Sequence, residues 1–243
     1  MPFLQTPQLS SARVGGAIAI TISSDISNYN LANDLTNNYD WDGVSPIEVA
    51  VTVNSGVYVY ATSTATPAFT ANLVAGSVLT INNNGTIVGR GGSGGSGGIW
   101  NGSQTGGSGG AGGNSISLSN VTCTINNESG GVIAGGGGGN GGNGSTRWNT
   151  NYDADSGCSA PTGNNGASGA SGYPNAYPVN NTTQGDPRSW GNAGSNGGTT
   201  SAGTFPPECP PTYYSGGSGG AAGKAINGTN TLNNSGNVYG ATS

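Results

Sequence analysis

The feature that most constrains this chain is a glycine repeat with a period of three between residues 91 and 223. A period of three is that of the polyproline II helix, which polyglycine also adopts. Such a helix makes no internal hydrogen bonds, so its N–H and C=O groups need partners outside it. The glycine-rich runs are residues 91–98, 106–113, 135–144, 163–172, 191–197 and 216–223.

Two interpretations of these runs compete. A flexible Gly/Ser linker has a similar composition. However, the triplet register persists across separate runs, and segments bearing aromatic residues, Pro and Cys separate them, for which a linker has no need. Because glycine has no Cβ, neighbouring helices can approach closely and hydrogen-bond laterally. We therefore expect an ordered polyglycine II helix bundle with long loops between its helices.

Composition excludes several classes of protein. Charged residues make up 6% of the chain, histidine is absent and the net charge is −5. No basic stripe exists to neutralise phosphates, so we expect no nucleic-acid partner. No apolar run approaches the roughly 20 residues of a membrane span, so we expect no membrane insertion.

The N-terminal part contains the strand signals. Alternating apolar runs predict strands at residues 17–23, 47–53, 57–61, 78–82 and 86–88. Leu31 and Leu35 predict one short helix over residues 27–37, and residues 64–75 are expected to form a loop. Asn54-Ser55-Gly56 is a hairpin signal. We therefore predict a mainly β N-terminal domain, a small antiparallel β-sandwich with an N-terminal arm (1–89), followed by the glycine-rich region (90–243).

An internal repeat crosses that boundary. Residues 80–89, which begin Thr-Ile-Asn-Asn, recur with variation at 124–135 and 231–240. Each copy is expected to form a strand, an Asn-rich turn and a second strand. Stacking of these hairpins predicts a short β ladder beside the glycine bundle.

The segments between the glycine runs carry the candidate binding residues. Tyr and Trp among Gly, Ser and Asn are typical of binding loops, and Arg is also frequent at binding hot spots. The alternative is that these aromatic residues pack on one another and order the loops. The candidates are Arg147, Trp148, Tyr152, Tyr173, Tyr177, Arg188, Trp190, Phe205, Tyr213 and Tyr214.

Neither catalysis nor metal binding has support in the sequence. The chain has one lysine and no histidine, and Asp153 and Asp155 are the only close carboxylate pair outside the N-terminal domain. We expect no enzyme activity, no metal site and no cofactor. Cys158 and Cys209 are expected to form a disulfide; the alternative is that all three cysteines are free, with Cys123 buried in a strand.

These patterns resemble a known family. The glycine triplets separated by aromatic segments resemble the tip adhesins of T-even-like phage long tail fibres. Residues 51–59 and 80–92 are similar to receptor-binding tail proteins of other tailed phages, in which a β domain leads into a glycine region. The first resemblance implies that polyglycine II helices display loops to a bacterial receptor, with residues 145–162, 173–190 and 199–215 as those loops.

The resemblance implies a non-enzymatic virion protein of the distal tail or tail fibre. It would bind a bacterial surface receptor, either an outer-membrane protein or a glycan, and would attach to another phage tail protein through its N-terminal domain. A homo-oligomer is compatible with the sequence. The alternatives are a passive structural or ice-binding polyglycine bundle and, less favoured, a polysaccharide depolymerase.

Overall fold

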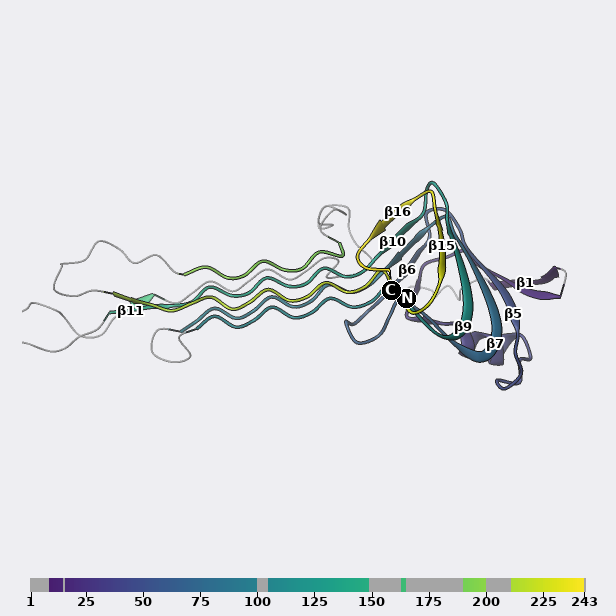
Figure 1. The fold of residues 1–243 in the computed structure, drawn as a ribbon, viewed down its shortest axis with the longest axis horizontal. Coiled ribbons are helices and arrows are strands. Elements are labelled where there is room, and N and C mark those ends of the chain that lie inside the picture. Colours follow the sequence, from purple (N-terminus) through teal and green to yellow (C-terminus); the bar gives the residue numbers. More distant parts are fainter. Residues whose placement is uncertain are drawn as a thin grey trace, which may run out of the picture.

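The computed structural model of the protein describes residues 9–14, 16–99, 105–148, 163–164, 190–199 and 211–242. A β-rich part forms one end, and glycine-rich segments run side by side away from it (Figure 1). The elements are β1 (Leu9–Val14), β2 (Ala17–Ile22), β3 (Ile26–Ser27), β4 (Tyr29–Asn30), α1 (Leu31–Asn38), β5 (Glu48–Val53), β6 (Tyr58–Tyr60), β7 (Phe69–Asn83), β8 (Thr86–Val88), β9 (Ile116–Asn127), β10 (Val132–Ala134), β11 (Thr146–Trp148), β12 (Gly163–Asn164), β13 (Pro211–Tyr213), β14 (Ile226–Asn227), β15 (Thr231–Asn234) and β16 (Asn237–Tyr239).

The β-rich part consists of two sheets whose strands are mostly parallel. The larger sheet has the order β1-β2-β5-β7-β9-β14, with β15 also on β9 and β4 also on β7; the smaller has the order β16-β10-β8-β6-β3. Within these sheets, β1 and β2 are the antiparallel pair that the structure describes. Consecutive strands such as β5 and β6 enter different sheets, so the chain winds from one sheet to the other and back.

The mainly β prediction is confirmed, but the antiparallel arrangement is wrong. The turn at Asn54-Ser55-Gly56 is a corner between the two sheets, not a hairpin. A hairpin turn and a corner between sheets can each place glycine at positive φ, which is +78° at Gly56. The turn residues therefore do not distinguish a hairpin from a corner. The predicted loop 64–75 is also partly wrong, because β7 begins at Phe69 and pairs with β9 from Ile116 onward.

The predicted helix is shorter than expected at its start. Asn28 has a positive φ of 49°, which ends β3, and Asn30 caps α1 by accepting a hydrogen bond from the Asn33 N–H at 3.1 Å. The helix buries Leu31 and Leu35 against the sheets.

The internal repeat stacks in register. Thr80, Ile81 and Asn83 of β7 lie opposite Thr124, Ile125 and Asn127 of β9, and the β15 copy continues the alignment from Thr231 to Asn234. Stacking of the three copies is therefore confirmed. Each copy turns a corner between the sheets and is not a hairpin.

Stacking aligns the asparagines into two amide ladders. In the inner ladder, Asn83 Nδ2 donates to Asn127 Oδ1 and Asn127 Nδ2 donates to Asn234 Oδ1, both at 2.8 Å. Asn82, Asn126 and Asn233 form an outer ladder with the same spacing. Asn83 and Asn127 are buried. The inner ladder ends where Val53 occupies the next position on β5, and Asn83 Oδ1 has no hydrogen-bond partner among the described residues.

The hydrophobic core lies between the two sheets. Alternate residues of the larger sheet point inward, so aligned side chains such as Ile20, Val51, Ile81 and Ile125 stack across the strands with at most 1% exposure. The core contains residues that precede Gly89 in the sequence and residues that follow it, such as Ile116 and Ile226.

Backbone hydrogen bonds connect the glycine-rich segments at every third residue. The N–H groups of Gly136, Gly139 and Gly142 donate to segment 107–113, whereas those of Gly138, Gly141 and Gly144 donate to segment 192–198. Carbonyls of segment 135–144 accept from segments 92–98 and 217–223. These bonds measure 2.8–3.0 Å. We call the described residues 89–99, 105–115, 135–145, 191–199 and 214–225 the stem. Because segment 135–144 bonds to four other segments, it is central to the described part of the stem.

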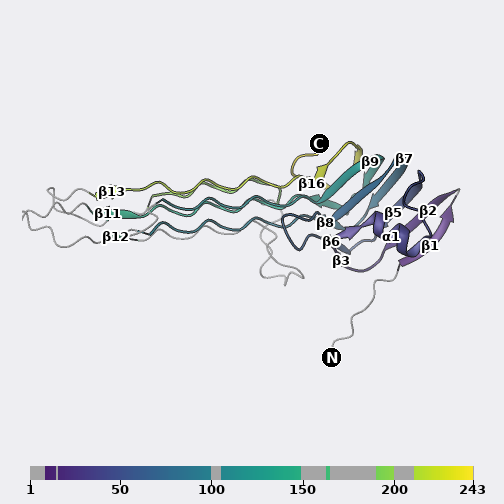
Figure 2. The same cartoon turned by 90° about the horizontal axis from the view of Figure 1, so that it is seen from below.

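The segments alternate in direction. Pairings such as Gly92 with Gly137 and Gly95 with Asn140 advance together, so residues 89–98 and 135–144 are parallel. Pairings such as Gly136 with Gly113 and Gly139 with Gly110 run in opposite senses. The chain therefore passes out along the stem and back again, as Figures 1 and 2 show.

Close approach explains why the stem needs glycine. A Cβ on Gly139 would lie 1.9 Å from the Ser93 carbonyl oxygen, and one on Gly141 would lie 1.9 Å from that of Gly217. Asparagine occurs where a side chain can reach a neighbouring segment, since Asn140 Oδ1 accepts from the Ser195 N–H and Asn143 Oδ1 from the Gly198 N–H, both at 2.8 Å.

We predict that Gly139→Ala lowers the thermal unfolding temperature markedly. The added methyl displaces backbone that cannot rotate away, a cost of at least about 1–3 kcal/mol. Gly198→Ala is the matched control, because its Cβ would meet Asn143 Oδ1 at an ordinary 3.8 Å. Equal melting temperatures for the two variants would contradict the packing described here.

We also predict that Asn127→Ala destabilises the protein by about 1–3 kcal/mol, because it interrupts the buried ladder at its middle rung. The control, Asn233→Ala, removes an exposed terminal rung of the outer ladder and should cost no more than about 0.5 kcal/mol. Urea unfolding of both variants measures the difference, and equal costs would show that the ladder contributes nothing special.

Candidate functional site

The end of the stem remote from the β-rich part is closed by a small three-stranded sheet with the order β12-β11-β13. All of its pairs are antiparallel: Thr146 lies opposite Asn164 and Tyr213, and Trp148 lies opposite Pro211. The Tyr214 N–H donates to the Ser145 carbonyl at 3.0 Å. Chain segments entering and leaving this end are therefore joined by backbone pairing (Figure 2).

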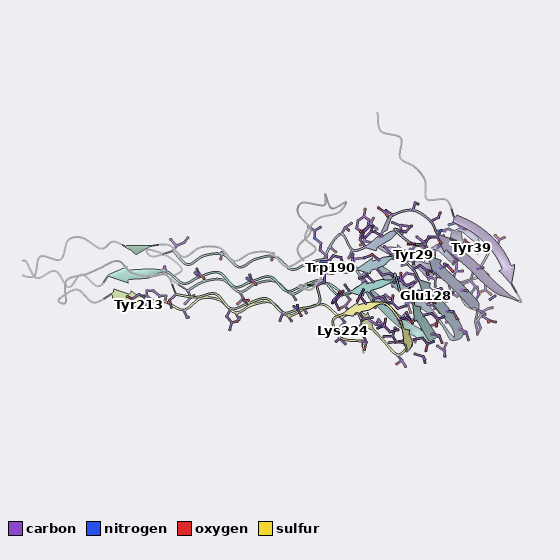
Figure 3. All side chains as sticks on the ribbon, turned by 90° about the horizontal axis from the view of Figure 1, so that it is seen from above. Tyr29, Tyr39, Glu128, Trp190, Tyr213 and Lys224 are labelled. Atoms are coloured by element: carbon purple, nitrogen blue, oxygen red, sulfur yellow. The ribbon has the colours of Figure 1, made fainter. Side chains whose placement is uncertain are left out.

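Four of the predicted binding residues lie at this distal end. Arg147 and Trp148 belong to β11, Tyr213 belongs to β13, and Tyr214 follows it. The Tyr213 side chain is 51% exposed, and Figure 3 shows it at the opposite end of the stem from the β-rich part. The structure thus brings together residues from segments that are more than 60 positions apart in sequence.

Trp190 lies elsewhere, at the junction between the stem and the β-rich part (Figure 3). It is 5% exposed and packs in a small cluster with Val88 and Ala134, against which Tyr60 and Tyr239 also pack. The next residue, Gly191, donates its N–H to the Gly135 carbonyl at 2.8 Å. Its surroundings are those of a packing residue, and its Nε1 has no hydrogen-bond partner among the described residues.

The remaining predicted site residues lie outside the described residues. They are Tyr152, Tyr173, Tyr177, Arg188 and Phe205, together with the predicted disulfide pair Cys158 and Cys209. The described residues that flank these positions show where the chain leaves and re-enters the described structure. Segments 149–162 and 200–210 are each bounded on both sides by described residues of the distal end. Segment 165–189, by contrast, begins after Asn164 at the distal end and ends at Trp190 at the junction.

Chemically, the described residues offer little reactivity. Cys123 is a free, buried thiol, and burial raises its pKa to about 12, so it stays protonated at neutral pH. Within the described ranges, no cluster of three His, Cys, Asp or Glu residues could hold a metal ion. Nor does that part of the chain contain a helix long and apolar enough to cross a membrane. Tyr213 exposes an aromatic side chain, which suits non-covalent binding.

A family model described as phage tail fibre adhesin Gp38 matches residues 17–243. The chain belongs to this family. The match covers both the β-rich part and the stem, so the resemblances of these two parts to phage tail proteins belong to one family. The predictions of a non-enzymatic receptor-binding protein that attaches a phage to its host, and of its location in the tail fibre, are thereby confirmed.

One solved structure is similar to the adhesin: "Crystal structure of the gp37-gp38 adhesin tip complex of the bacteriophage S16 long tail fiber". The two chains are 21% identical, and the alignment covers 91% of this chain and 79% of the other with a TM-score of 0.47. No curated protein matches the sequence.

We predict that Trp190 stabilises the adhesin and does not contact the receptor. Trp190→Ala should cost about 3–5 kcal/mol of folding free energy because it empties a buried site. Trp190→Phe keeps most of the packing, so it should melt within a few degrees of the parent and block phage adsorption equally well. Loss of blocking by a well-folded Trp190→Phe adhesin would instead place Trp190 in the receptor contact.

Proposed function

We propose that this Gp38 adhesin recognises its host through the distal end of the stem, and that the stem is a bundle of polyglycine II helices. The observation that carries the proposal is the placement of exposed Tyr213 beside β11 at the end farthest from the β-rich part. The surface recognised would be an outer-membrane protein or a glycan of the host bacterium.

The hydrogen-bond pattern supports the polyglycine II assignment. Along residues 136–144, one set of N–H groups points to one neighbour at every third residue, and a second set, offset by two, points to another. A β-strand would repeat every second residue. A repeat of three with all partners in other segments is the arrangement that polyglycine II requires.

The distal segments 149–162 and 200–210 carry Tyr152, Phe205, Cys158 and Cys209, and we propose that they extend the receptor-binding surface formed around Tyr213. Both segments begin and end next to described residues of the distal end, which supports the predicted Cys158–Cys209 disulfide between them. Segment 173–189, with Tyr173, Tyr177 and Arg188, ends at the junction, so its part in receptor binding is secondary in this proposal.

At the other end, we propose that residues 1–89, within the β-rich part, attach the adhesin to the fibre, while the stem projects toward the host. The similar solved structure is a complex of a gp38 adhesin with gp37, so a gp37-type fibre protein is the proposed partner. This arrangement places the partner and the receptor at opposite ends of the molecule.

The test is competition between purified adhesin and whole phage for host cells. Tyr213→Ser combined with Tyr214→Ser should raise the concentration needed for half-maximal blocking about tenfold or more, since aromatic anchors dominate binding interfaces. Val78→Ser is the matched control, because Val78 is a similarly exposed apolar residue (43%) on β7, remote from the distal end. Equal blocking by both variants would contradict the proposed receptor surface.

A further inference from the structure

A groove of about 380 Å³ lies beside α1, in the β-rich part. Asn33 and Thr36 of α1 line one side, Trp41 lies in the loop that follows the helix, and Asn72, Leu73 and Asn120 line the other side. Figure 3 shows Tyr39, the residue that follows α1, at the opposite end of the molecule from Tyr213. The groove therefore lies in the end of the molecule that is remote from the proposed receptor surface.

The far wall of the groove is built by an irregularity in the larger sheet. The register between β7 and β9 shifts between Asn72 and Ser77, and Asn120 adopts a positive φ of 55° there. Asn72 Oδ1 accepts hydrogen bonds from Ser119 Oγ at 2.8 Å and from Asn120 Nδ2 at 3.3 Å. These amides form a fixed polar rim, which suits an extended polypeptide whose backbone needs hydrogen-bond partners.

The loop of residues 39–47, between α1 and β5, holds an apolar side chain in solvent. Asp42 Oδ1 accepts the N–H groups of Val44 at 2.9 Å and Ser45 at 2.8 Å, and Asp42 Oδ2 accepts Ser45 Oγ at 2.5 Å. Trp41 Nε1 donates to the Ser45 carbonyl at 2.8 Å. Val44 is consequently fixed while 74% exposed. A preorganised apolar contact of this kind loses little conformational entropy on binding.

The surroundings of this loop are acidic. Residues 14–89 contain Asp25, Asp34, Asp40, Asp42 and Glu48, half of the ten carboxylates in the chain, and no Lys or Arg. Asp34 is buried and accepts from the Tyr29 hydroxyl, whereas Asp40, Asp42 and Glu48 are exposed. Hydrogen bonds from Ser45 and Val44 lower the pKa of Asp42, so this carboxylate stays ionised. A surface that carries several exposed carboxylates attracts a cationic partner.

We propose that loop 39–47, with Glu48 at the start of β5, and the adjoining groove dock an extended segment of the fibre protein that carries Lys or Arg next to an apolar residue. The apolar residue packs against Val44 and Trp41, and the basic residue lies among Asp40, Asp42 and Glu48. This inference rests on the proposed attachment of residues 1–89 to the fibre. A second copy of the adhesin would bring the same negative charges and be repelled, and residues 1–8 contain no Lys or Arg side chain to complement them.

The test measures binding of full-length adhesin to the purified fibre protein of the same phage. Asp40→Asn combined with Glu48→Gln should weaken binding about fivefold at low salt and less at high salt, because screening weakens the charge attraction. Val44→Ser should weaken binding by a similar factor at both salt concentrations. Glu128→Gln is the control, an exposed carboxylate elsewhere in the β-rich part (Figure 3), and should change binding less than twofold.

Hydroxyl-radical footprinting of the complex separates the possible failures. Protection of Trp41 and Val44 supports the docking site. Protection confined to other residues of the β-rich part overturns this site while leaving fibre attachment by that part intact, and protection confined to the stem overturns the attachment proposal itself. If the variants change the oligomeric state of the free adhesin, measured by light scattering, the loop binds a second copy and the inference is wrong.

Discussion

The stem depends on hydrogen bonds between bare backbone segments. Segment 135–144 is surrounded by neighbours on several sides, and its N–H and C=O groups find partners only because no Cβ separates the chains. Each bond contributes on the order of 1 kcal/mol net, and glycine loses more backbone entropy on ordering than other residues. The stem is therefore stable only when all its segments are present, because removing one segment leaves unpaired N–H and C=O groups on its neighbours.

The β-rich part supplies the register from which the stem starts. The smaller sheet stacks β8, β10 and β16, and the chain leaves β8 at Gly89 and β10 at Gly135 directly into the stem. Because β8 and β10 pair in register, the glycine segments that follow them enter the stem in register. The Trp190 cluster packs against the ends of these strands, and the buried asparagine ladder aligns the corners between the sheets.

The sequence predicted those features that depend on repetition. The glycine period predicted lateral pairing at every third residue, and the Thr-Ile-Asn-Asn copies predicted strands that stack. It did not predict the parallel winding, because a glycine turn such as Asn54-Ser55-Gly56 satisfies a corner and a hairpin equally well. Nor did it separate Trp190 from Tyr213, since both are aromatic residues beside glycine runs, and only the path of the chain shows that one is buried at the junction.

The groove beside α1 was beyond sequence reasoning for a similar reason. It exists because the register shift at Asn72 and the left-handed conformation of Asn120 come together across two strands that are distant in sequence. The hydrogen bonds of Asp42 and Trp41 to Ser45, which fix Val44 outward, form only in the folded loop.

Amide hydrogen exchange of the intact adhesin tests the central claim most directly. The backbone N–H groups of Gly136, Gly139 and Gly142, which donate to segment 107–113, should exchange orders of magnitude more slowly than in an unstructured glycine peptide. Exchange of these amides at the rate of a free peptide would show that the lateral hydrogen bonds do not hold the stem together.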